Sequence, residues 1–284
     1  MGWLVGTILQ FKYSTNQLFS IEDHKGGIMP KKFFLIFVFI VCFSLLAEGT
    51  GQGITAEEII KTMTETLNPE QSEAVVEMTI TTSGGQERTF VYKAYSKNSG
   101  EKNLMKYLEP GRVKNQAILM LNNADDIWMY FPGTNRVRKL ATHAKRQKVQ
   151  SSDFSYEDLG SSNEFIENYN SVLLGEEEKE GELCYKLELT RKEDSDAGYS
   201  RLIVWVEKEN YVPLVIDYYH EKDPELLEKE LILSDIEMID DIPTPMKMLM
   251  YNKLDNTKTV MEFKELIYDV DLPDNLFTEM GMKK

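Results

Sequence analysis

Residues 74–95 read AVVEMTITTSGGQERTFVYKAY, and this stretch decides the fold. In its first half, apolar side chains recur at every second position, at Val76, Met78 and Ile80, with polar residues between them. That period of two indicates a β-strand with one buried face. The Ser-Gly-Gly turn that follows favours a hairpin, with a second strand over 88–95.

The strand pattern continues almost to the C-terminus. Further apolar runs are separated by turn-forming residues, as in Pro132-Gly133-Thr134-Asn135. Short strands without alternating helices predict an antiparallel sheet that is closed, half closed or folded into a sandwich. No Pro- or Gly-rich linker divides the chain, which favours a single domain. The further strands are predicted over 103–108, 116–121, 127–131, 136–140, 172–177, 184–190, 201–206, 212–219, 230–237, 246–251 and 258–268.

Two segments depart from this pattern. Thr55 and Glu58 have the spacing of a capping box, and apolar residues then follow at helical spacing until a proline ends the run. They predict a helix over 56–67. The segment 151–169 lacks alternation and carries serines of the kind that cap helices, so we expect a loop with one or two short helical turns.

Composition excludes some functions. The chain has 284 residues, of which 32 are basic and 47 acidic, and its formal net charge is −15. Because phosphates would be repelled by most of such a surface, a general nucleic-acid binder is disfavoured. Two cysteines and three histidines leave little material for a disulfide framework or a zinc module.

An apolar run near the N-terminus indicates export. Residues 33–46 read FFLIFVFIVCFSLL and follow two lysines. The run is shorter than the about 20 apolar residues that span a bilayer. A positive start, an apolar centre and small residues after it are typical of a cleaved signal peptide. An uncleaved anchor is the alternative.

These features predict the domain organisation. We expect an upstream extension over 1–28, a signal peptide over 29–49 and one mature domain over 50–284. Cys42 is not preceded by the small residue of a lipoprotein signal, so we do not expect acylation there. The predicted location is the periplasm.

The sequence carries no catalytic motif. His143 and His220 lie outside any metal-binding or catalytic context, and no nucleophile elbow or phosphate loop occurs. Adjacent acids such as Glu157-Asp158 are common in so acidic a chain. We therefore assign no catalytic residue, no metal and no cofactor, and expect a protein that is not an enzyme. A carboxylate-based hydrolase ranks well below the other hypotheses.

Three predicted strands are apolar on both faces. Residues 116–121 read QAILML, 127–131 read IWMYF and 202–206 read LIVWV. An antiparallel sheet normally leaves one face in water. Such strands need either a second packed layer or a cavity on their other side. The pattern alone favours the packed layer, but it does not exclude a cavity.

A set of motifs adds a family resemblance. In chain order they are YLEPGR at 107–112, WMYFP at 128–132, RVRK at 136–139, SDFSYEDL at 152–159 and LPDNLFT at 272–278. Their order and spacing resemble the outer-membrane lipoprotein-sorting proteins of the LolA-like superfamily. The resemblance covers roughly the whole predicted mature chain. It is closer to the uncharacterised lipoprotein-sorting-like subgroup than to the archetypal lipoprotein carrier.

The resemblance implies a mainly β fold. It is a half-open antiparallel β-barrel with an N-terminal helix and short lid helices that close a hydrophobic concavity. The implied function is a periplasmic carrier that binds the acyl chains of a lipid or lipoprotein and transfers them between envelope components. Its partners would be the lipid, an inner-membrane transporter and, transiently, an anionic membrane surface. The alternative is a sensor or scaffold of the same fold that binds a membrane partner.

Two groups of candidate residues follow. Aromatic and apolar side chains of the doubly apolar strands and of 151–169 are expected near the acyl chain, although strand parity leaves open which of them face it: Leu119, Trp128, Tyr130, Phe131, Phe154, Tyr156 and Trp205. No acidic residue lies between Asp126 and Asp153, which makes this stretch a basic island. We expect its cations to dock on anionic headgroups or an acidic partner beside the cavity mouth: Arg136, Arg138, Lys139, Lys145, Arg146 and Lys148.

Overall fold

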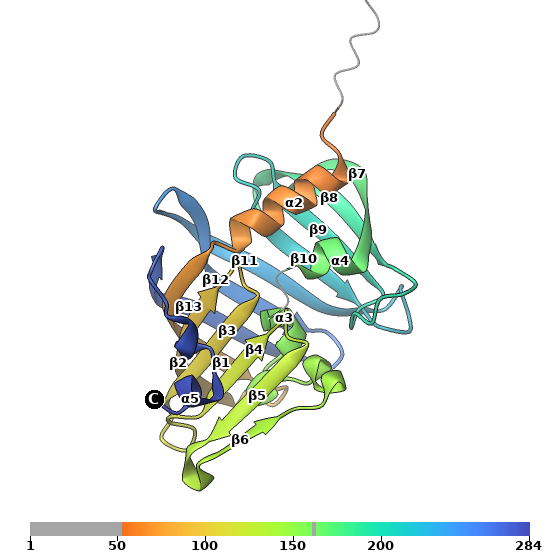
Figure 1. Ribbon diagram of the computed structural model, residues 1–284. Coiled ribbons are helices and arrows are strands. Elements are labelled where there is room, and N and C mark those ends of the chain that lie inside the picture. The colour runs from red at the N-terminus through yellow and green to blue at the C-terminus, as the bar shows by residue number, and fades with distance from the viewer. Residues whose placement is uncertain (1–52, 161–162) are drawn as a thin grey trace, which may run out of the picture. The chain divides into compact units, whose positions relative to one another are not determined.

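In the described residues, 53–160 and 163–284, thirteen strands form one antiparallel sheet (Figure 1). This computed structural model confirms all thirteen predicted strands and the half-open barrel, because the sheet curves without closing. The strands are β1 (Gln71–Thr81), β2 (Glu87–Lys97), β3 (Lys102–Glu109), β4 (Ala117–Leu121), β5 (Asp126–Phe131), β6 (Arg136–Lys139), β7 (Tyr169–Lys179), β8 (Glu182–Arg191), β9 (Arg201–Glu207), β10 (Pro213–Tyr219), β11 (Leu227–Ile239), β12 (Ile242–Asn252) and β13 (Thr257–Tyr268).

The strand order consists of two meanders joined in the middle. Strands β1 to β6 lie side by side in sequence order, as do β7 to β13, and β1 pairs with β13. Strands β6 and β7 are therefore the two open edges, although they follow each other in the chain. The crossover segment, of which the structure describes residues 140–160 and 163–168, must pass from one edge to the other. It does so across the concave face, which explains why this stretch is not a strand.

The N-terminal helix has the predicted bounds. Helix α2 (Ala56–Leu67) begins with a capping box, in which Glu58 N donates to Thr55 Oγ1 at 3.2 Å and Thr55 N donates to Glu58 Oε2 at 2.8 Å. Its apolar side packs with the concave face of the sheet, where Ile59, Ile60 and Met63 are fully buried.

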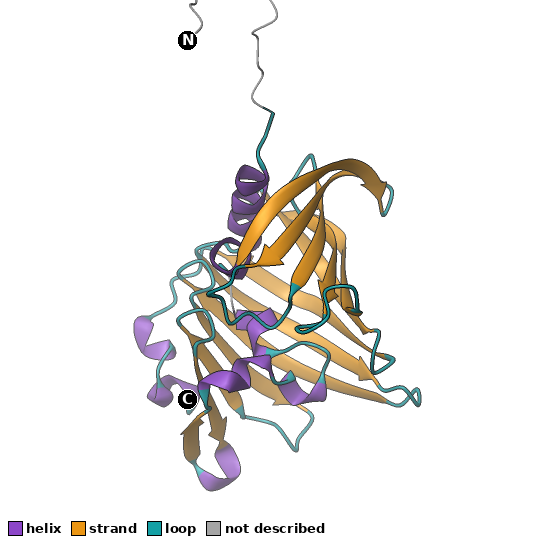
Figure 2. Ribbon diagram, turned by 90° about the vertical axis from the view of Figure 1, so that its right-hand side faces the viewer, coloured by secondary structure: helices purple, strands orange, loops and turns teal. Residues whose placement is uncertain are grey.

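The crossover segment carries several short helices. Figure 2 shows the strands bending around this segment and α2. The prediction of one or two helical turns over 151–169 is confirmed. The short helices of the crossover segment are η2 (Thr142–Arg146), η3 (Val149–Ser151), α3 (Tyr156–Gly160) and α4 (Glu164–Asn168).

The C-terminal segment, residues 269–284, covers part of the convex face. After β13 the chain forms η4 (Asp274–Leu276) and α5 (Glu279–Met282), and α5 contacts β4 and β5. A short 3₁₀ turn, η1 (Pro132–Thr134), connects β5 to β6.

Residues 54–284 form one compact unit. The upstream extension and the signal peptide predicted over 1–28 and 29–49 lie outside the described residues. In the part of the chain that the structure describes, no helix is long and apolar enough to cross a bilayer.

Candidate functional site

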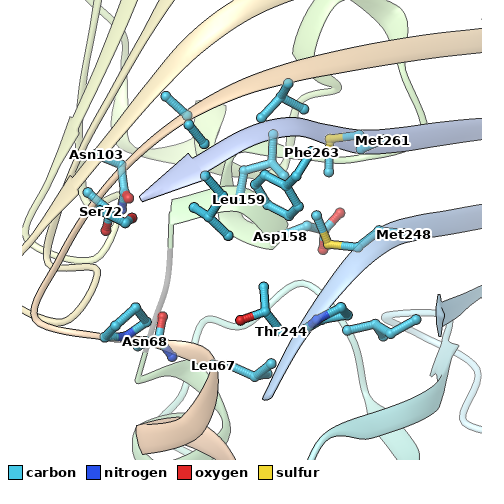
Figure 3. Close-up of a pocket in the computed structure, with 18 of the residues that line it drawn as sticks. Leu67, Asn68, Ser72, Asn103, Asp158, Leu159, Thr244, Met248, Met261 and Phe263 are labelled. Atoms are coloured by element: carbon cyan, nitrogen blue, oxygen red, sulfur yellow. The ribbon is translucent and has the colours of Figure 1, made fainter. Parts of the chain in front are cut away.

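A cavity of about 320 Å³ lies on the concave face of the sheet (Figure 3). Its walls come from β1 to β4 and β10 to β13, with the C-terminal end of α2 at one side. Leu159 and Phe165 of the crossover segment complete the wall. Its volume is at the lower end of the range of about 300–1,000 Å³ found for small-molecule sites.

The cavity exists because small side chains face each other across β1 and β2. Ala74 pairs with Ala94, next to a pair of serines, and all four residues line the cavity. Further along the same face Met78 pairs with Phe90, and these larger side chains are fully buried. The side chains thus decrease in size along the two strands. One end of the barrel is filled, and space remains at the other end.

Methionines provide much of the apolar wall. Met105, Met120, Met248 and Met261 come from four different strands and all line the cavity. The hydroxyl of Tyr92 lies 3.3 Å from the sulfur of Met261. Because methionine is flexible and polarisable, such a wall adapts to ligands of irregular shape.

Uncharged polar residues gather at the start of β1 and β3 and at the end of β2. Figure 3 shows Ser72 and Asn103 next to each other on one side of the cavity, with Asn68 below them on the same side. On the β12 side, the hydroxyls of Thr244 and Tyr268 are hydrogen-bonded at 2.8 Å. These residues form the mouth of the cavity, which is polar without being charged.

The crossover segment is attached to the sheet through Asp153. This carboxylate is almost completely buried and accepts hydrogen bonds from Thr257 Oγ1 at 2.5 Å and Thr259 Oγ1 at 2.8 Å. The backbone N–H of Asp153 donates to Thr259 Oγ1 at 2.9 Å. The aspartate of the SDFSYEDL motif therefore has a structural role that ties η3 to β13.

A second attachment involves Asp158, which lines the cavity. Its carboxylate accepts hydrogen bonds from the Tyr199 hydroxyl at 3.0 Å and from the backbone N–H of Ser155 at 2.7 Å. Lys229 lies 3.3 Å from the same carboxylate, and both side chains of this ion pair are buried. The ion pair fixes α3 against β11.

Two further buried carboxylates lie beside this ion pair. Burial, reinforced by the neighbouring charge of Asp158, raises the pKa of Glu157 to about 7. Burial also raises the pKa of Glu164 well above its ordinary value, and Glu157 and Asp158 add to that rise. Glu157 accepts a hydrogen bond from the backbone N–H of Gly198 at 3.1 Å. Glu157 and Glu164 therefore keep their protons at pH values at which an exposed carboxylate is already ionised.

The structure places three of the predicted lining residues on the opposite face of the sheet. Leu119, Trp128 and Tyr130 pack on the convex side with Leu272 and Phe277 of the C-terminal segment. None of the three lines the cavity. Both faces of β4 and β5 are apolar because one covers the concave core and the other is covered by this segment, so the packed layer accounts for the pattern there.

The other predicted lining residues also lie outside the cavity wall. Trp205 belongs to a separate convex cluster, where its indole N–H donates to Glu177 and Lys179 lies over its ring. Phe154 and Tyr156, which belong to the crossover segment, are buried in the concave core. Phe131 lies under the Arg138 guanidinium, 5.7 Å from its ring centre.

The basic island divides into two parts. Lys145 is buried and paired with Asp196 at 2.9 Å and Asp125 at 3.4 Å, so it is not available for docking. Arg146 pairs with Glu221 at 2.7 Å, and Lys148 pairs with Asp255 at 2.5 Å. These three cations have internal acidic partners that are far away in the sequence.

The remaining cations lie on the edge strand β6. Lys139 pairs with Asp126, while Arg136 and Arg138 are exposed and no ion pair of theirs occurs among the described residues. Residues of β5 and β6 do not contribute to the cavity wall. The island therefore does not line this cavity, whose mouth is built by the end of α2, β1 to β3 and β12.

Part of the actual cavity wall has a signal in the sequence. The alternation in β1 and β2 identifies one face, and Ala74 and Ala94 are the small residues on it. The sequence does not show which residues of β4 and β5 share that face, because the side chains on both faces of these strands are apolar. The site residues Leu159 and Phe165 lie in a segment without periodicity.

The described residues contain no group of three or more side chains placed to hold a metal ion. Burial raises the pKa of the free Cys184 thiol to about 11, so this cysteine is not an activated nucleophile.

Comparison with known structures identifies the family. The structure is similar to a DUF1329 family protein from Desulfovibrio piger, with 31% identity, a TM-score of 0.71, and coverage of 80% of this chain and 97% of that chain. An outer membrane lipoprotein-sorting protein domain from Vibrio parahaemolyticus shares 26% identity and a TM-score of 0.73, over 81% of this chain and 98% of that chain. The chain belongs to the DUF1329 family and has a LolA-like fold. A LolA superfamily protein from Nitrosomonas europaea has the same fold, with a TM-score of 0.67 at 24% identity over 80% of this chain and 98% of that chain.

Sequence comparisons give two further matches. A family profile described as "Uncharacterized protein" matches residues 99–284, which include β3 to β13. An uncharacterized protein of Methanocaldococcus jannaschii is 25% identical over 213 residues, or 75% of this chain. The chain spans 57% of the length of that curated relative.

Proposed function

We propose that this LolA-like protein is a lipid carrier that encloses an acyl chain of a lipid or lipoprotein in the concave cavity. The observation that carries the proposal is the apolar cavity itself, lined by methionines and small side chains and closed by the crossover segment. Similarity to an outer membrane lipoprotein-sorting protein domain supports it. The protein acts by binding and transfer rather than by catalysis.

The energetics suit transfer between membranes. Each methylene that leaves water for an apolar site contributes about 0.8 kcal/mol. A bilayer provides nearly the same gain, so moving a chain from a membrane into the cavity is close to neutral. The direction of transfer must therefore come from a partner. We place the carrier in the periplasm, exported by the predicted signal peptide, with a membrane transporter as the partner.

Contact with an anionic membrane would use the edge strand β6. Arg136 and Arg138 are exposed, and each cation near an anionic surface contributes about 1 kcal/mol. The edge lies away from the cavity wall, so docking and acyl binding are separable functions.

The test is lipid occupancy before and after the cavity is filled. We expect the purified protein to carry an extractable acyl lipid, visible by native mass spectrometry. Ala94→Phe places a ring in the cavity and should abolish occupancy while the melting temperature changes little. The matched control, Thr89→Phe, puts the same ring at an exposed position of β2 and should leave occupancy intact.

Two results would contradict the proposal. One is a wild-type protein that neither carries an acyl lipid nor binds one when it is added. The other is an unchanged lipid content in a folded Ala94→Phe protein. A protein that binds lipid but never releases it to acceptor vesicles would favour the sensor hypothesis instead.

A further inference from the structure

The wall of the cavity is almost free of charge. Among the described residues that line it, Asp158 is the only charged side chain, and there is no lysine, arginine or histidine. Asp158 is itself neutralised by Lys229 and by the hydrogen bonds from Tyr199 and Ser155. The other polar residues of the wall carry amides and hydroxyls, at Thr66, Asn68, Ser72, Tyr92, Tyr95, Ser96, Asn103, Tyr218, Thr244 and Tyr268.

The lysines that neighbour the mouth in sequence are directed elsewhere. Lys97 follows the mouth residue Ser96, but it donates to the carbonyl oxygen of Leu272 at 2.7 Å and pairs with Asp274 at 3.1 Å. Lys102 pairs with the same aspartate at 3.4 Å. Both cations hold the C-terminal segment on the convex face and do not serve the cavity.

This distribution selects the head of the ligand. A carboxylate or phosphate that entered the mouth would lose hydration without gaining a counter-ion, which is costly. A hydroxyl, ester or amide head would instead exchange its hydrogen bonds with water for bonds to the hydroxyls of Ser72 and Ser96. The mouth therefore favours an uncharged polar head over an anionic one.

The volume limits the number of chains. About 320 Å³ lies at the bottom of the range for a single compact ligand. Much of the wall is packed between the sheet and the pinned crossover segment. Asp153 and Asp158 hold that segment at two points, so the cavity cannot expand freely to admit several chains.

We propose that the cavity accepts one acyl chain with an uncharged polar head, such as a monoacylglycerol, and rejects free fatty acid anions and multi-chain lipids. This inference rests on the proposed function, because it specifies the ligand of the same cavity. It goes beyond acyl binding in general, because it predicts that ligands with an uncharged polar head bind more tightly than anionic ligands with the same chain length.

The experiment compares three ligands with the same ten-carbon chain at pH 8. Delipidated protein is titrated with 1-monodecanoylglycerol, decanoate and 1,2-didecanoylglycerol. We expect the monoacylglycerol to bind at least 10-fold tighter than either of the others. As the pH is lowered towards 5 and decanoate becomes partly protonated, its affinity should rise, while that of the monoacylglycerol stays flat.

A gain-of-function variant tests the cause. Ser72→Lys adds a cation at the half-exposed mouth, and it should improve decanoate binding at pH 8 about 10-fold with little effect on the monoacylglycerol. Ser72→Gln and Thr89→Lys are the matched controls, one without the charge and one with the charge at an exposed position, and neither should change decanoate binding.

Decanoate binding as tightly as the monoacylglycerol at pH 8 would overturn the head preference. So would a folded Ser72→Lys protein with unchanged decanoate affinity. Equal affinity for one-chain and two-chain glycerides would overturn the single-chain limit. Failure of all three ligands to bind would instead overturn the proposed function, and the inference with it.

Discussion

The two faces of the sheet at β3 and β4 are both apolar, and they are used differently. On the convex face, Leu104 and Leu119 pack with Leu272, Phe277 and Met282, and Leu104 also borders the cavity. On the concave face, the same strands contribute methionines to a cavity that the crossover segment covers without filling it. An apolar strand face is thus no guide to ligand binding by itself. What differs is the size of the opposing side chains.

The largest effect is expected from opening the convex cluster. Phe277→Ala removes a buried ring, and such truncations cost about 3–5 kcal/mol of unfolding free energy. Chemical denaturation should show this loss, with acyl-lipid affinity unchanged for the folded fraction. Met280→Ala, in the same segment but exposed, is the control and should cost little. A Phe277→Ala protein that is stable but no longer binds lipid would show that the convex cluster is part of the site.

The second effect concerns the buried carboxylates of the crossover segment. The pKa of Glu157 is about 7 in the folded protein, against an ordinary value of 4.5. Between these two values the folded state binds more protons than the unfolded state, so the unfolding free energy should fall as the pH rises from about 4.5 to 7.5. At about 1.4 kcal/mol per pKa unit, Glu157 contributes a loss on the order of 3 kcal/mol.

Glu157→Gln should flatten this pH dependence when unfolding is followed by urea titration at several pH values. Gln keeps the shape of the side chain and cannot ionise. Glu178→Gln, at an exposed position of β7, should leave the slope unchanged. Stability that rises over this pH interval in the wild type would contradict the burial of these carboxylates.

The smallest effect is expected at the edge strand. Reversing both arginines, Arg136→Glu with Arg138→Glu, should slow lipid uptake from anionic vesicles at low salt by about 10-fold, since two cations contribute about 2 kcal/mol or less. Raising the salt concentration should remove the difference. Lys61→Glu with Lys222→Glu is the control, made at exposed lysines elsewhere. Equal uptake rates of the wild type and the double variant at low salt would show that β6 is an ordinary solvated edge strand without a docking role.

The sequence predicted the strands and the helix because their signals are local. Alternation, turn residues and the capping box at Thr55 and Glu58 act within a few positions. The pairing of β1 with β13 is a contact between distant segments, and so is the cover that Phe277 provides for Leu119. Because both parities of β4 and β5 are apolar, only these distant contacts decide which face encloses the cavity.

The basic island illustrates the same limit. Lys145, Arg146 and Lys148 form a continuous cationic stretch in sequence, yet their partners Asp196, Glu221 and Asp255 arrive from the other half of the chain. The positive charges that have no acidic neighbour in the sequence therefore have acidic partners in the folded protein. The two cations of β6 remain exposed because an edge strand has a neighbour on one side only.

The most direct test of the account is to map where a bound acyl chain lies. A monoacylglycerol with a diazirine in its chain can be bound to the protein, photolysed, and located by peptide mass spectrometry. The account predicts labels on cavity residues such as Met105, Met120 and Met261, and their loss in Ala94→Phe. Labels on Trp128, Tyr130 or Phe277 would contradict it, because they would place the chain on the convex face.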